Sequence, residues 1–224
     1  MNPKFAQSVA QALANFGFAT LAALLSFPAQ ASGKADLKSG YAAVLRHDHG
    51  LAIQYLTSAI EAGDLSRANL ALAYHYRGAE YLKTDRYDDA IVDLDRAIAL
   101  EPRLPAAYSD RGIAYRKKGD YEKAIAEYSA AIEIWPNWHD WYFNRGLAYA
   151  AMGRHNEAIA DFGKALFFKP DFAEGYVARA DAYLQKGRTI EALADYHKAL
   201  RERPGIRQDY PGIAAKMAML SAAP

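Results

Sequence analysis

His47, Asp48 and His49 are the residues of this sequence whose types and spacing come closest to a reactive centre. Two imidazoles and a carboxylate within three residues form a donor set that a transition metal ion could use. No further ligand is spaced nearby to complete a coordination shell. The interpretation we favour is a solvated turn between two helices, because the repeat register described below places these residues in one.

Carboxylates that could act as general acid and base occur at Asp88-Asp89 and at Asp93 and Asp95. Their regular spacing is typical of a solvated helix surface, and the other histidines are scattered. The sequence contains no phosphate-binding glycine loop, nucleophile elbow or two-histidine zinc motif. It also has no cysteine, which excludes a thiol nucleophile and a disulfide framework. We therefore predict a protein that is not an enzyme and that has no catalytic residue, cofactor or metal site.

The composition is that of a folded domain with balanced charge. The 224 residues include 27 Lys and Arg and 26 Asp and Glu, and 52% are apolar. A core of ordinary size is therefore available. A formal charge of +1 gives no field strong enough to attract a nucleic-acid backbone, so we expect no nucleic-acid partner.

The elements that must position any site are set by a repeat of 34 residues. The dipeptide Arg-Gly recurs at Arg77, Arg111 and Arg145, and Arg179-Ala180 follows at the same spacing. Further columns hold small residues, aromatic residues and a closing proline in all four copies. Members of these columns include Tyr74, Tyr108, Tyr142 and Tyr176; Ala90, Ala124, Ala158 and Ala192; Leu94, Tyr128, Phe162 and Tyr196; and Pro102, Pro136, Pro170 and Pro204.

The spacing of these columns predicts two amphipathic helices in each copy, because small and apolar residues recur at steps of three and four. Turn residues separate the two helices, for example at Gly119, Gly153 and Gly187. Proline ends the second helix. One such helix pair cannot bury its apolar face alone, so neighbouring copies must stack.

The pattern resembles the tetratricopeptide repeat family, with arginine in place of the family's leucine before the glycine column. The resemblance implies an all-α fold, a right-handed α-solenoid of helix-turn-helix repeats. Four full copies are expected at residues 71–104, 105–138, 139–172 and 173–206, and a degenerate copy at about 33–66. The solenoid would then occupy 32–206, with a C-terminal capping segment at 207–224. In that segment we expect Ala214, Ala215, Met217, Ala218 and Leu220 to face the stack.

Two charged columns run through the four full copies. The arginine of each Arg-Gly or Arg-Ala dipeptide is followed 16 residues later by a carboxylate, at Asp93, Glu127, Asp161 and Asp195. Both columns lose their charge together in the degenerate copy. This favours an ion pair within each repeat over a row of arginines that binds acidic ligands. If the pairs are partly exposed, each is expected to contribute only ~0.5 kcal/mol.

The family resemblance also implies a concave face lined by the first helices. Lys83, Arg116 and Lys117 give its N-terminal half a basic character, which suits a partner segment with apolar anchors and an acidic residue. The alternative is that these charges only solvate the surface. Asn144 is the one element present of the set with which some relatives grip a C-terminal carboxylate. The predicted partner-binding residues are His75, Lys83, Ser109, Ile113, Arg116, Lys117, Phe143, Asn144, Leu147, Val177, Asp181 and Gln185.

All three tryptophans lie close together, at Trp135, Trp138 and Trp141, where the second full repeat meets the third. Aromatic residues are enriched at binding hot spots. An aromatic core between the repeats is the structural alternative.

The N-terminal segment has the features of a signal peptide. An uncharged apolar run from Phe16 to Phe27 is too short to span a bilayer, and it precedes the small-residue pattern Ala29-Gln30-Ala31. We expect cleavage after Ala31, so that residues 1–31 are removed and the protein is exported, to the periplasm or, as the alternative, to the outside of the cell. The other interpretation of this segment is an amphipathic N-terminal helix that packs on the body of the protein. No membrane span is expected in the mature chain.

The sequence thus predicts an exported, non-catalytic scaffold that binds a protein or peptide in the groove of a tetratricopeptide solenoid. The alternative is a structural subunit that forms a homo-oligomer by self-association at the tryptophan-rich junction. The sequence does not identify the partner.

Overall fold

The computed structural model describes residues 32–221, and this part of the chain is helical and has no strands. Ten helices form five consecutive pairs. The pairs are α3 (Gly33–Leu45) with α4 (His49–Glu61), α5 (Arg67–Lys83) with α6 (Tyr87–Leu100), α7 (Pro105–Lys117) with α8 (Tyr121–Ile134), α9 (His139–Ala151) with α10 (His155–Phe168), and α11 (Ala173–Gln185) with α12 (Thr189–Glu202). Two short helices follow, α13 (Ile206–Asp209) and α14 (Ile213–Ser221). The predicted all-α solenoid is confirmed, whereas the predicted signal peptide lies outside the described residues.

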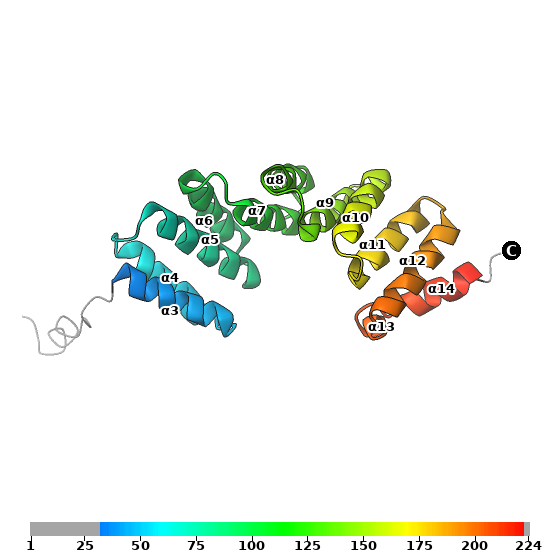
Figure 1. The fold of residues 1–224 in the computed structure, drawn as a ribbon, viewed down its shortest axis with the longest axis horizontal. Helices are drawn as coiled ribbons and strands as arrows, with labels where there is room; N and C mark the ends of the chain where they lie inside the picture. The colour runs from blue at the N-terminus through cyan, green and yellow to red at the C-terminus, as the bar shows by residue number, and fades with distance from the viewer. Residues whose placement is uncertain (1–31, 222–224) are drawn as a thin grey trace, which may run out of the picture.

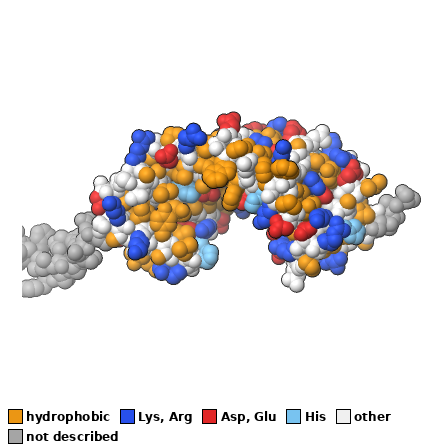
Figure 2. Space-filling view, in the orientation of Figure 1, with side chains coloured by type: hydrophobic (Ala, Val, Ile, Leu, Met, Phe, Trp, Pro, Cys, Tyr) orange, Lys and Arg blue, Asp and Glu red, His pale blue; other side chains and the backbone are white. Residues whose placement is uncertain are grey.

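The five helix pairs stack into an arch (Figure 1). Each helix packs against the next one along the chain, and consecutive first helices such as α5 and α7 also contact each other. The second helices of neighbouring pairs approach each other less closely. The stack is therefore curved, and the first helices line its underside. Figure 2 shows that this underside is hollowed between the two halves of the arch.

Each helix pair has a bulky side chain set against a glycine or alanine. Tyr128 and Phe162 are 0% and 1% exposed and lie on the second helices α8 and α10. A Cβ atom at Gly112 would lie 2.8 Å from a ring carbon of Tyr128, and one at Gly146 would lie 2.7 Å from a ring carbon of Phe162. Both distances are shorter than van der Waals contact. The glycine column of the repeat thus exists because the aromatic ring occupies the place of a side chain.

Replacing Gly146 with alanine is expected to lower the free energy of unfolding by about 1–2 kcal/mol, because Phe162 is closely packed and must shift. Gly163, in α10, is a matched control, since a Cβ there would lie 3.7 Å from the Arg179 guanidinium, in ordinary contact. Gly163→Ala is expected to raise stability by about 0.5–1 kcal/mol through helix propensity. Urea denaturation followed by circular dichroism measures both. Equal effects of the two substitutions would contradict the steric explanation.

The tyrosine and proline columns join neighbouring repeats. The Tyr142 hydroxyl donates a hydrogen bond to the carbonyl of Pro136 at 2.9 Å, and Tyr176 donates to Pro170 at 3.0 Å. In the degenerate first copy, Asp64 stands in the proline column. Its Oδ1 accepts a hydrogen bond from the backbone N–H of Gly33 at 3.0 Å, so that it ties the end of α4 to the start of α3. The aspartate that replaces proline in this copy therefore links the two helices of the first pair by a hydrogen bond from backbone to side chain.

The turn within each pair requires a left-handed residue. Glycine provides it in the last three pairs, with φ of 85° at Gly119, 72° at Gly153 and 69° at Gly187. The first two pairs use His47 and Asp85, both at φ 58°. This confirms the predicted role of the turn glycines.

The C-terminal helices cover the end of the stack by a different face from the one predicted. Ile206 and Ile213 are 0% and 2% exposed and join the core formed by α11 and α12. Met217 and Leu220 pack against the same core, as predicted. The expected contacts of Ala214, Ala215 and Ala218 are wrong, because these alanines are exposed. Ile213 sets which face turns inward, and residues four and seven positions later share that face.

Candidate binding surface

The repeated arginines form ion pairs that hold the two helices of each repeat together. Arg145 donates from Nε and Nη2 to the two carboxylate oxygens of Asp161 at 2.7 and 2.9 Å. Arg77 and Arg179 bind Asp93 and Asp195 with the same two-atom geometry, and Arg111 binds Glu127 through Nη2. The predicted pairing within each repeat is confirmed.

These ion pairs are more buried than the sequence suggested. The residues Asp161 and Asp195 are 6% and 7% exposed. Hydrogen bonds to Asp161 raise the pKa of Arg145, so its guanidinium stays charged. Arg145 also reaches the previous repeat, because Nη1 donates to Ser129 Oγ at 2.9 Å. The arginines are therefore structural, and they are not available as a row of ligand-binding charges.

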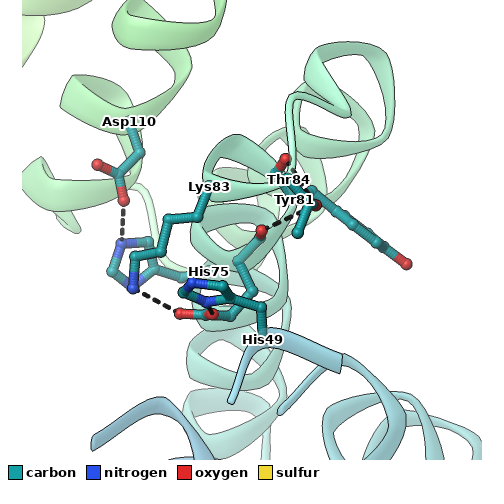
Figure 3. A network of polar contacts seen from close by, with 7 residues as sticks. His49, His75, Tyr81, Lys83, Thr84 and Asp110 are labelled. Atoms are coloured by element: carbon teal, nitrogen blue, oxygen red, sulfur yellow. Dashed lines mark hydrogen bonds and ion pairs between the residues drawn. The ribbon is translucent and has the colours of Figure 1, made fainter. Parts of the chain in front are cut away.

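Glu80 of α5 is a fully buried carboxylate that contacts His49 of the preceding repeat. Figure 3 shows the surrounding network, in which His49, His75, Lys83 and Asp110 are labelled. The Oε2 atom of Glu80 lies 2.6 Å from His49 Nδ1, and its Oε1 accepts from Lys83 Nζ at 2.7 Å. Next to it, His75 Nε2 lies 2.9 Å from Asp110 Oδ2. His47 and Asp48 do occupy the predicted turn, where Asp48 Oδ1 caps α4. His49 instead belongs to the buried network, because stacking brings α5 against it.

The predicted concave residues fall into three groups. His75, Ser109 and Val177 are 8%, 6% and 2% exposed, so they offer little surface to a partner. Lys83 is paired with Glu80, and the Nε atom of Arg116 is buried. Lys83 and Lys117 nevertheless remain exposed, so the side chains of the predicted basic patch still contact solvent. The remaining predicted residues line two cavities: Ile113 and Asn144 the first, and Phe143, Leu147, Asp181 and Gln185 the second.

The first cavity, which we call the tryptophan pocket, is lined both by residues of the predicted concave face and by the predicted tryptophan cluster. Its volume is about 480 Å³, and it opens between the first helices α7 and α9. Trp138 and Trp141 have ring centroids 6.3 Å apart, and Trp138 Nε1 donates to Asp140 Oδ2 at 3.1 Å. Trp141 is 7% exposed and belongs to the core, whereas Trp135 and Trp138 are 56% and 48% exposed. The lining consists of Pro105, Ala106, Ser109, Asp110, Ile113, Trp135, Trp138, Asp140, Trp141 and Asn144.

The second cavity, of about 630 Å³, lies at the C-terminal end of the underside. Phe143 and Leu147 form its apolar wall, and Lys216 of α14 binds Asp181 on the opposite side. Asp181 also accepts a hydrogen bond from Tyr196, and burial raises the pKa of that phenol. The C-terminal segment therefore occupies part of the groove that the first helices would otherwise leave open.

Neither cavity brings metal-ligand side chains together in the described part of the chain. Within residues 32–221 no cluster of three or more His, Asp or Glu side chains is placed to hold a metal ion. In the same part of the chain, no helix combines the length and apolar character needed to cross a membrane.

Sequence reasoning missed the carboxylates of the tryptophan pocket and of the buried network. Glu80 interrupts a column that otherwise holds Ala114, Ala148 and Ala182, and this interruption was visible in the repeat. Asp110 precedes Asn144 by one repeat length and shares its column. The repeat columns gave no indication of a role for Asp140, because only the fold shows that its carboxylate accepts a hydrogen bond from Trp138.

Family models match the repeats found in the sequence. A model described as TPR repeat matches residues 78–119, 112–153 and 146–187, and a model described as Tetratricopeptide repeat matches 173–206. Together they span more than half of the chain. A search of curated proteins finds no significant match.

Solved structures with the same architecture include three informative cases. MamA protein has a TM-score of 0.67 at 26% identity, over 80% of this chain and 94% of its own. TTC0263, a thermophilic TPR protein in Thermus thermophilus, has a TM-score of 0.64 at 25% identity, over 84% of this chain and 100% of its own. A chain of the APC/C hetero-tetramer Cut9-Hcn1 has a TM-score of 0.71 at 21% identity, over 85% of this chain and 36% of its own, which shows the fold alone.

Proposed function

Because the chain belongs to the tetratricopeptide repeat family, a family of protein-interaction scaffolds, we propose that it binds a segment of a partner protein along its underside, without catalysis. The tryptophan pocket is the centre of this proposed surface. One observation carries the proposal: the pocket combines the concave residues Ile113 and Asn144 with the exposed rings of Trp135 and Trp138.

The physical basis is the exposed apolar surface of the pocket. Tryptophan at an interface contributes a large contact area and loses little conformational entropy on binding. Trp135 and Trp138 each leave about half of their surface in water. Both rings face a cavity between rigid helices, so a partner segment would not have to order the site itself.

Site-specific photo-crosslinking tests this proposal. A benzoylphenylalanine residue at position 113 is expected to crosslink one discrete partner in extracts of the source cells, and excess unmodified chain should compete. The same residue at Val92 is the control, because Val92 is 59% exposed on the second helix α6. Crosslinks of equal yield from both positions would contradict a binding site on the underside.

Self-association through the tryptophan-rich junction is the competing proposal, favoured by the exposure of Trp135 and Trp138. It predicts that the species crosslinked at position 113 is a second copy of this chain. It also predicts a molar mass that rises with protein concentration, which sedimentation equilibrium measures. A concentration-independent monomer mass would exclude it.

A further inference from the structure

The tryptophan pocket carries negative charge as well as aromatic surface. Asp110 and Asp140 both line it, and its lining contains neither lysine nor arginine. The two carboxylates are 24% and 46% exposed at their side chains. The pocket is therefore partly dehydrated and acidic, in contrast to the basic surface expected from the sequence.

Existing hydrogen bonds orient the carboxylates of Asp110 and Asp140 but leave acceptor positions for further hydrogen bonds. Asp140 Oδ2 accepts from the Trp138 indole at 3.1 Å, and Asp110 Oδ2 lies 2.9 Å from His75 Nε2. A carboxylate has about four acceptor positions. Each group can therefore accept further donors from a molecule in the pocket.

His139 does not cancel the charge of Asp140. Its Nε2 lies 3.1 Å from Asp140 Oδ1. Burial lowers the pKa of the His139 imidazole, so that the ring is neutral at pH 7. No positive charge on His139 therefore offsets the carboxylate beside the tryptophan rings.

We propose that the tryptophan pocket receives an arginine side chain of the bound partner segment, with Asp140 and Asp110 as its acceptors and Trp138 and Trp135 as its stacking surfaces. This inference rests on the proposed function, because the arginine belongs to the partner protein. A cation above an aromatic face is attracted by the ring, and the attraction increases when water is excluded. Charge complementarity thus selects a basic partner group over an acidic or neutral one.

The shape of the pocket favours arginine over lysine. The guanidinium is planar, stacks on aromatic rings and presents several donors at once, whereas the lysine ammonium is compact and strongly hydrated. The protein uses the same contact internally, since the guanidinium of Arg86 lies 4.2 Å from the Tyr81 ring centroid. Ile113, Ala106 and Pro105 supply an apolar wall for a residue beside the arginine.

Tryptophan fluorescence is a selective probe, because all three tryptophans of the chain line this pocket. The full chain would be titrated to millimolar concentrations with the blocked dipeptide acetyl-Leu-Arg-amide. The control dipeptide carries citrulline, which has the shape of arginine without its charge. We expect saturable binding of the arginine peptide, with a Kd about tenfold lower than for the citrulline peptide.

Isosteric substitutions test which groups are responsible. Asp140→Asn is expected to weaken binding of the arginine peptide about tenfold, and Asp110→Asn is the second variant in case the first disturbs folding. Glu122→Gln is the matched control, because it removes one negative charge at the far end of α8 from Trp135. Trp135→Leu, followed by calorimetry, is expected to reduce binding several-fold.

The outcomes separate this inference from the proposed function. Equal binding of the arginine and citrulline peptides, no saturable response, or equal loss in Asp140→Asn and Glu122→Gln would each overturn the arginine site. If crosslinking at position 113 still captures a partner in those cases, the scaffold function stands and only the chemistry of the anchor is wrong. If the arginine peptide binds but no partner crosslinks there, the proposed function fails instead.

Discussion

Replacing Arg145 with methionine is expected to lower the free energy of unfolding by about 3 kcal/mol. The substitution keeps most of the aliphatic volume but leaves the Asp161 carboxylate without its two charged donors. That carboxylate is 6% exposed, so water cannot replace the lost hydrogen bonds. Ser129 would also lose its bond to Nη1, which weakens the contact between the third and fourth helix pairs. Urea denaturation followed by circular dichroism measures the change.

Arg86→Met is the matched control for this substitution. Arg86 pairs with Asp89 at 2.7 Å, but both side chains are about half exposed. Breaking such an exposed pair is expected to have a much smaller effect than breaking the Arg145–Asp161 pair. A double variant, Arg145→Met with Asp161→Leu, is expected to recover part of the loss, because it removes the buried unpaired charge. Equal effects of Arg145→Met and Arg86→Met would show that burial of the pair is unimportant.

The second large effect is expected at the buried carboxylate Glu80. Replacing His49 with alanine should cost about 2 kcal/mol, because Oε2 of a fully buried carboxylate is then left without its hydrogen bond. Replacing Glu80 itself with alanine should cost less than about 1 kcal/mol, since no buried charge is left behind. The size of the effect therefore depends on which of the two partners is removed.

The protein contains an internal precedent for the Glu80→Ala variant. The fourth helix pair places His155 at the helix position of His49, and the fifth pair places Ala182 in the column of Glu80; both residues line the second cavity. The stack therefore already contains one junction, His155 with Ala182, that has the histidine of His49 but an alanine where Glu80 would be. Thermal denaturation of His49→Ala, Glu80→Ala and the double variant forms a double-mutant cycle. Equal destabilisation by the two single variants would contradict the argument.

The sequence alone determined the helix pairs, their stacking and the ion pairs within each repeat. The reason is that these features depend on residues close in the chain and recur every 34 positions. Arg145 and Asp161 are 16 residues apart on two helices joined by a short turn, so their meeting follows from the local register. The close contact between Gly146 and the ring of Phe162 follows from the same register.

The tertiary structure alone decided which of the predicted surface residues lie together in a cavity. Stacking brings together side chains from successive repeats, such as His75 with Asp110, and the C-terminal helix brings Lys216 to Asp181; both pairs are 35 residues apart. It buried three predicted groove residues and paired Lys83 with Glu80. It also turned two separate hypotheses, a concave face and a tryptophan cluster, into one acidic aromatic pocket. Side-chain direction across a helix junction depends on the packing of the neighbouring repeat, and a column of residue types does not encode that packing.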